Sequence, residues 1–126
     1  MELKSYQKQV IDDLQLYFEY LQNHKKASVA FNTFWQEKVG FYNPLTGEGM
    51  RPYQNTVPNA VHLSIKVPTA GGKTFIACNA LKTIFDAMPD TKARAVVWLV
   101  PWSNLLDQTV RNLSNPDHPY CQKLNS

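Results

Sequence analysis

The feature that most constrains this chain is a glycine-bearing stretch that ends in Gly-Gly-Lys-Thr at residues 71–74. It follows an alternating apolar segment, 61–67, and it precedes an amphipathic segment that runs from about Lys73 to Met88. The backbone amides and the dipole at a helix start both favour an anion at this place. The pattern therefore predicts a strand, a phosphate-binding loop and a helix, in that order.

We place the phosphate-binding loop at residues 67–74, Val-Pro-Thr-Ala-Gly-Gly-Lys-Thr. A lysine at this position reaches the terminal phosphates of a nucleotide, and the following hydroxyl ligates Mg²⁺. We therefore predict ATP and Mg²⁺ as cofactors, Lys73 as the catalytic residue and Thr74 as the metal ligand. The predicted nucleotide-binding residues of the loop are Thr69, Ala70, Gly71, Gly72, Lys73 and Thr74. Val67 departs from the strict pattern, and a strand–helix turn with a surface lysine is the structural alternative.

Composition bounds the class of protein without naming its function. The 126 residues are 44% apolar and 18% charged, as in an ordinary globular domain. A net charge of +3 adds little weight to nucleic-acid binding. The two cysteines and three histidines show neither a disulfide framework nor zinc-ligand spacing. The sequence has no signal peptide and no apolar run of about 18 residues, which favours a cytoplasmic protein without a membrane span.

The remaining periodicity predicts an α/β fold. Apolar residues recur every three or four positions over 3–21, which indicates an amphipathic helix. Residues 27–39 indicate a short second helix with an aromatic face, and 40–59 are loop material rich in glycine and proline. Residues 95–100 form a near-continuous apolar run of the buried parallel-strand type, and Ser103 begins another helix.

These segments predict three parts. Residues 1–26 hold the N-terminal helix, 27–60 an aromatic-rich insertion and loop, and 61–126 the start of an ATP-binding lobe. The order strand, loop, helix, strand and helix in the last part is that of a right-handed parallel unit. A set of aromatic side chains is interpreted as the core of the insertion rather than as a base-stacking platform: Phe31, Phe34, Trp35, Phe41 and Tyr42.

Three stretches resemble superfamily 2 helicases of the DEAD/DEAH-box type and, within these, the Res subunit of type III restriction enzymes. They are residues 3–7 (Leu-Lys-Ser-Tyr-Gln) before a helix, the loop 67–74, and 97–101 (Val-Trp-Leu-Val-Pro) followed by Leu105 and Gln108. Residues 117–120, Asp-His-Pro-Tyr, are also similar to the continuation of that family. The resemblance spans most of the chain and implies a partial RecA-like P-loop NTPase lobe.

The resemblance also implies a function. The chain would be the ATP-binding part of an ATP-dependent DNA helicase or translocase, of the kind that drives a type III restriction system. Gln7 would select adenine through its side-chain amide. The turn Pro101, Trp102 and Ser103, with Gln108 on the following helix, would contact the nucleic acid. A modification or specificity subunit is the implied protein partner, and RNA stays open beside DNA.

Gln54 is an alternative to Gln7 as the adenine-selecting residue. The residue identities at 51–54, Arg-Pro-Tyr-Gln, match the usual opening motif of the family more closely than residues 3–7 do. Pro58 follows four residues later, however, and leaves no room for the helix that this opening requires. We therefore prefer Gln7, which makes residues 27–60 an insertion ahead of Lys73.

Phosphoryl transfer also needs acidic residues for Mg²⁺ and for the attacking water. In helicases these follow a later apolar strand, and no such strand follows residue 113. Asp12 and Asp13 imitate the acidic pair, but the helical period places both on a polar face. We therefore expect an N-terminal fragment of the first motor lobe that binds nucleotide weakly, does not hydrolyse it, and associates with itself through an open sheet edge.

Two other classes of protein remain open on the sequence. One is a different P-loop enzyme that hydrolyses or transfers phosphate without acting on nucleic acid. The other is a non-catalytic scaffold that binds nucleotide. Stimulation of ATP hydrolysis by nucleic acid separates the first from a helicase, and the absence of any ATP hydrolysis by the intact protein separates the second.

Overall fold

The protein is described here from a computed structural model, which covers residues 2–58, 60–68, 72–88 and 94–125. Thr69, Ala70 and Gly71 of the predicted phosphate-binding loop lie outside these ranges. The chain forms two compact units, one of Met1–Ile11 with Pro68–Ser126 and one of Asp12–Val67. The predicted insertion 27–60 falls within the second unit, and the three-part division stays a prediction.

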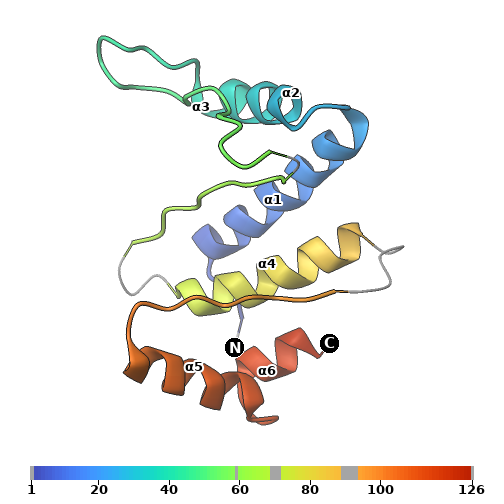
Figure 1. Ribbon diagram of the computed structural model, residues 1–126, viewed down its shortest axis with the longest axis vertical. Helices are drawn as coiled ribbons and strands as arrows, with labels where there is room; N and C mark the ends of the chain where they lie inside the picture. Colours follow the sequence, from blue (N-terminus) through green and yellow to red (C-terminus); the bar gives the residue numbers. More distant parts are fainter. Residues whose placement is uncertain (1, 59, 69–71, 89–93, 126) are drawn as a thin grey trace. The chain divides into compact units, whose positions relative to one another are not determined.

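The predicted α/β fold with a parallel sheet is wrong for the residues that the structure describes, because these form helices and no strand. Residues 61–68 and 94–100, where the sequence predicts strands, have irregular backbone and appear in Figure 1 without arrows. The backbone N–H and C=O groups of a strand need hydrogen-bond partners on a neighbouring strand. Residues 61–67 belong to one unit and 94–100 to the other, and no ladder forms in the described ranges.

The sheet edge through which we expect self-association is therefore also missing from the described residues. Residues 95–100, which the sequence predicts to be buried, are half-buried at Trp98 and Val100 and exposed at the other four positions. Val97 is 82% exposed and Leu99 is 87% exposed. An apolar run of this kind becomes a buried strand only where other strands and helices cover it, because its local sequence supplies no partner of its own.

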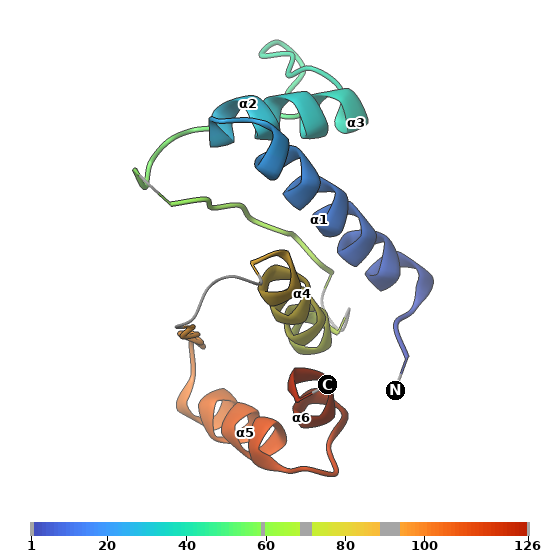
Figure 2. The same cartoon turned by 90° about the vertical axis from the view of Figure 1, so that its right-hand side faces the viewer.

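Three helices make up most of the first unit. They are α4 (Lys73–Ala87), α5 (Ser103–Ser114) and α6 (Pro119–Leu124), together with the first turns of α1 (Ser5–Asn23). Helix α6 packs against both α4 and α5, as both views show (Figures 1 and 2). The Phe75 ring of α4 stacks on the Tyr120 ring of α6 with 5.9 Å between their centroids. Helices α4 and α5 begin at Lys73 and Ser103, where the sequence predicts helix starts.

The apolar face of α5 is only partly covered. Leu105, Leu106 and Val110 are 38%, 45% and 55% exposed, respectively. The spacing of apolar residues predicts α5 correctly, because this spacing depends only on the residues of the helix itself. The layer that would bury its apolar face is the predicted sheet, which the described residues do not form.

The second unit has an aromatic core around Tyr17 of α1. The segment 27–39 is helical throughout, as α2 (Ala27–Phe31), the π-helical turn η1 (Asn32–Gln36) and α3 (Glu37–Val39). The Tyr17 ring is fully buried and lies 5.7–6.1 Å, centroid to centroid, from the rings of Phe31, Phe34 and Trp35. The predicted aromatic core is confirmed for these three residues. It is wrong for Phe41, which is 77% exposed.

Asp13 is a second correction within this unit. The helical period places it on a polar face, but its exposed fraction is 8%. Its Oδ1 atom lies 2.8 Å from Nζ of Lys38, which follows Glu37 in α3. The segment 27–39 therefore covers one side of the polar face of α1, and the buried carboxylate is paired there.

The loop that follows α3 is tied to the π-helical turn and to itself. Asn32 Oδ1 accepts a hydrogen bond from the Tyr53 N–H at 2.8 Å, and Gln36 Nε2 donates to the Met50 carbonyl at 3.4 Å. His62 Nε2 lies 2.9 Å from the Gln54 carbonyl oxygen. None of the described helices is both long enough and apolar enough to cross a membrane.

Candidate nucleotide-binding site

The start of α4 is the best-defined feature of the predicted site. Gly72 has φ 75° and ψ 42°, in the left-handed region that favours glycine, and Lys73 is the first residue of the helix. The Ile76 N–H donates to the Gly72 carbonyl at 3.0 Å, which closes the first helical turn. The amides of residues 73–75 precede any intrahelical acceptor, and no side chain caps them. This helix start therefore offers free N–H donors to an anion.

Lys73 and Thr74 lie on the open side of that first turn. Lys73 is exposed and Thr74 is half-buried, whereas the next two residues, Phe75 and Ile76, are only 6% and 4% exposed. Burial of the apolar pair fixes the rotation of the helix, so Lys73 faces solvent. Among the described residues Lys73 makes no ion pair with a carboxylate. Its ammonium group is thus available to a phosphate.

Gln7 lies beside this helix start. Its exposed fraction is 5%, and its Oε1 atom accepts a hydrogen bond from the Lys4 N–H at 2.9 Å. A Cβ placed on residue 72 would collide with the Gln7 Nε2 atom. The structure thus brings together Gln7 and Gly72, which are far apart in the sequence. The same burial leaves little of the amide open to a base.

Gln54, the alternative to Gln7, belongs to the other unit. It is exposed, and the described residues after it contain no helix before α4. Its carbonyl oxygen is held by His62, as described above. Of the two glutamines, only Gln7 belongs to the same unit as Lys73.

The predicted nucleic-acid contacts lie on α5 and on the turn before it. Pro101, Trp102, Ser103 and Gln108 are all exposed, and Trp102 is 66% exposed. The Trp102 carbonyl accepts from the Leu106 N–H at 3.0 Å, and the Asn104 Oδ1 atom accepts from the Leu105 N–H at 3.0 Å. The turn therefore presents an indole ring beside the amides of Ser103 and Asn104, which is a combination that can bind a base and a phosphate.

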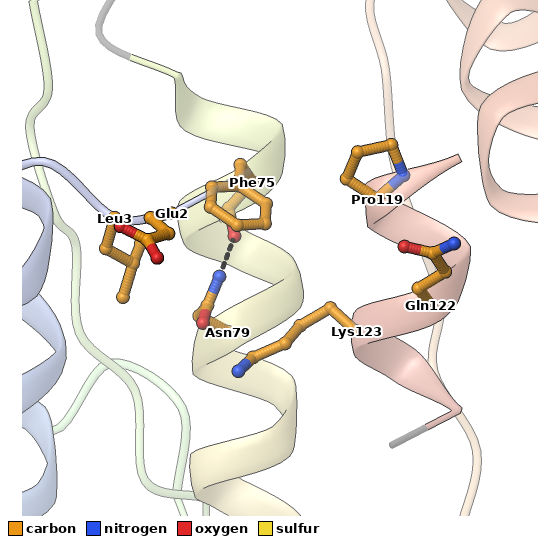
Figure 3. A pocket seen from close by; sticks show the side chains of 7 residues that line it. All are labelled: Glu2, Leu3, Phe75, Asn79, Pro119, Gln122 and Lys123. Atoms are coloured by element: carbon orange, nitrogen blue, oxygen red, sulfur yellow. Dashed lines mark hydrogen bonds between the residues drawn. The ribbon is translucent and has the colours of Figure 1, made fainter. Parts of the chain in front are cut away.

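A shallow hollow of about 380 Å³ lies along α4. Figure 3 shows its lining: Phe75 and Asn79 from α4, Pro119, Gln122 and Lys123 from α6, and Glu2 and Leu3 from the N-terminal segment. Asn79 is 4% exposed, and its Nδ2 donates to the Phe75 carbonyl at 2.8 Å. The hollow combines an aromatic ring with amide and charged groups, which suits a flat polar ligand.

Sequence reasoning passed over the residues of this hollow. One signal was present, because Asn79 interrupts an apolar stripe that includes Ile76 and Ala80. A polar residue within such a stripe is buried and needs a hydrogen-bond partner. The neighbouring Cys78 is fully buried, and burial raises the pKa of its thiol to about 11, so it is no nucleophile at neutral pH.

A helix that begins with Lys-Thr directly after a left-handed glycine is typical of nucleotide-binding proteins. The family model described as "Type III restriction enzyme, res subunit" matches residues 1–125. The chain therefore belongs to this family, which is a family of superfamily 2 helicase domains, and the resemblance seen in the sequence is confirmed. Membership implies an ATP-dependent, helicase-like function of the restriction-enzyme type. No curated protein and no solved structure matches the chain.

Proposed function

We propose that this chain is the ATP-binding part of an ATP-dependent DNA helicase or translocase, the motor of a type III restriction system. The observation that carries the proposal is the start of α4, where the left-handed Gly72 is followed by the exposed Lys73. Membership in the Res family supports it, because that family implies ATP-dependent, helicase-like activity.

The residues at this helix start fit Mg²⁺-ATP. Uncapped amides and the Lys73 ammonium supply positive partners for the β- and γ-phosphates, and the Thr74 hydroxyl is a hard oxygen ligand that suits Mg²⁺. When bound, ATP supplies the phosphoryl group whose transfer to water drives the motor. The hollow along α4, with the Phe75 ring and the Asn79 amide, would suit a purine base, and Gln7 leaves no room for a side chain at Gly72 beside the proposed phosphate site.

DNA is the proposed polymer substrate, and the turn before α5 is the proposed contact. Trp102 would stack on a base, and the Ser103 and Asn104 amides that follow it would donate hydrogen bonds to a backbone phosphate. Ser103 and Gln108 are exposed on the same helix and would donate further hydrogen bonds. A modification or specificity subunit would supply sequence recognition, since phosphate and stacking contacts carry little sequence information.

The test compares two lysine variants, Lys73→Ala and Lys66→Ala. Both side chains are exposed, so neither substitution disturbs the core. Binding of a fluorescent ATP analogue to the 126-residue chain should be lost in Lys73→Ala and retained in Lys66→Ala. In the natural full-length protein, ATP hydrolysis should rise with duplex DNA and should be abolished by Lys73→Ala.

Three results would contradict the proposal. Hydrolysis that is indifferent to both DNA and RNA would indicate a P-loop enzyme that does not act on nucleic acid. Binding of the ATP analogue that is unchanged in Lys73→Ala would remove the helix start as the nucleotide site. The absence of any ATP hydrolysis by the wild-type protein would favour a non-catalytic scaffold.

A further inference from the structure

The loop after α3 is closed and internally bonded. The Met50 N–H donates to the Gly40 carbonyl at 2.8 Å, and the Asn43 N–H donates to the Glu48 carbonyl at 2.8 Å. Phe41 and Met50 form an isolated β-bridge, and a Cβ on residue 49 would collide with the Phe41 carbonyl oxygen. Together with Arg51, which follows the bridge, we call this segment the 40–51 loop. Backbone hydrogen bonds restrict the conformation of this loop, and they therefore restrict the directions in which its side chains project.

This loop presents large apolar side chains to solvent. Phe41 is 77% exposed and Leu45 is 94% exposed. Gln36 of the π-helical turn holds the Met50 carbonyl, so the base of the loop is tied to the unit whose core contains Tyr17. An aromatic ring held in the open by a bonded backbone loses little conformational entropy when a flat partner stacks on it.

The same loop carries a cation, which lies over the ring of Tyr42, the residue that follows Phe41. The guanidinium of Arg51 lies over the Tyr42 ring, 5.0 Å from its centroid. This contact uses the flat face of the guanidinium and leaves its N–H groups for an acceptor. Arg51 is exposed and forms no ion pair with any carboxylate that the structure describes.

The charge around Arg51 also favours a polyanion. Residues 49–67 contain no aspartate or glutamate, and they carry the exposed cations Arg51 and Lys66. Glu48 is the one carboxylate within the loop, and it is exposed. Arg51 is the one lysine or arginine within the 40–51 loop.

We propose that the 40–51 loop is a contact for single-stranded nucleic acid, in which Phe41 stacks on an unpaired base and Arg51 binds a phosphate. Stacking tolerates any base, and a phosphate contact carries no sequence information, so the contact is independent of sequence. Trp102, the residue of the predicted contact, and Lys73 both belong to the other unit.

The test measures fluorescence anisotropy of a labelled oligothymidylate of about 20 nucleotides, a length that spans one or two binding sites, against the 126-residue chain at low salt. Phe41→Ala should weaken binding at least about fivefold, the low end of the effect of removing one stacked base. Arg51→Gln should weaken binding too, and should lower the slope of log affinity against log salt by about 0.7, the value for one phosphate contact on a single strand. Glu48→Gln should tighten binding.

Leu45→Ala is the matched control, because Leu45 is on the same loop and is more exposed than Phe41 but has no aromatic face. It should bind within twofold of wild type, and circular dichroism should show every variant folded. A labelled duplex with the same number of nucleotides in each strand should bind more weakly than the single strand.

Three results would overturn the proposal. The first is no binding of the oligonucleotide by the wild-type chain at low salt. The second is binding by Phe41→Ala and Arg51→Gln within twofold of wild type. The third is an equal loss in Leu45→Ala and Phe41→Ala, which would identify the loop as an apolar surface for a protein partner.

Discussion

A Cβ added at residue 72 would collide with the side-chain amide nitrogen of Gln7. Gln7 lies in the first turn of α1, and Gly72 immediately precedes α4, so this contact joins the starts of two helices. Position 72 is therefore restricted to glycine twice, by its left-handed backbone and by the space that Gln7 fills.

Gly72→Ala should destabilise the chain more than Gly47→Ala does. The two glycines have nearly the same φ, 75° and 76°, but an added Cβ at residue 47 meets nothing within 4 Å. Gly47→Ala should cost about 1–2 kcal/mol, from the left-handed conformation alone. Gly72→Ala adds the collision with Gln7, which is worth about 1–3 kcal/mol as overpacking. Urea unfolding measures both values.

The double variant Gln7→Ala with Gly72→Ala is the control for that collision. Removing the Gln7 amide should recover part of the stability lost in Gly72→Ala. Equal losses in the two glycine variants, with no recovery in the double variant, would show that the Gln7 side chain moves aside without cost.

Tyr17→Phe should stabilise the protein at neutral pH. The Tyr17 ring is fully buried, and its hydroxyl finds no hydrogen-bond partner among the described residues. A buried unpaired hydroxyl costs about 1–3 kcal/mol, so its removal, with the ring contacts kept, should raise the free energy of unfolding by about 1 kcal/mol. Urea denaturation at pH 7 checks this. A loss of stability would mean that the hydroxyl has a partner, such as a bound water.

The stability of the chain should fall at alkaline pH because of Cys78. Burial raises the pKa of its thiol from 9.0 to about 11. The unfolded chain therefore ionises first, and the stability that depends on the neutral thiol is complete below pH 9 and is lost as the pH rises to about 11. Chemical unfolding from pH 7 to 11 should show this decline.

Cys78→Ala is the control for the alkaline decline. It should start from a lower stability at pH 7, because it leaves a small cavity, but it should lose less between pH 9 and 11. Tyr17 adds its own decline at higher pH, since burial raises the pKa of its phenol to about 12. Parallel pH profiles for wild type and Cys78→Ala would refute the assignment to the thiol.

Trp102→Ala should weaken nucleic-acid binding without destabilising the fold. The indole is 66% exposed, so its truncation should change the free energy of unfolding by no more than about 0.5 kcal/mol. Binding of a single-stranded oligonucleotide should weaken at least about fivefold if a base stacks there. Trp98→Ala is the matched control, because Trp98 is half-buried and should lose stability rather than binding.

The helices could be predicted because their information is local. The apolar period over residues 3–21 indicates a helix, and α1 spans Ser5–Asn23. The Gly-Lys-Thr signal places a helix start at Lys73, where α4 begins. Each helical hydrogen bond joins residues four apart, so neighbouring residues carry most of the signal for a helix. The family could be inferred for a related reason, since short motifs at fixed places are visible without a fold.

The sequence by itself therefore determined the helices, the family and the lysine–threonine pair at the start of α4. Only the tertiary structure decided which segments pair with, or pack against, other segments. The apolar runs 61–67 and 95–100 pair with no strand in the described ranges, Phe41 faces solvent, and Asp13 is buried against Lys38. It also decided that Gln7 lies beside Gly72. Burial and strand pairing depend on residues distant in sequence, and no local pattern records which of them will meet.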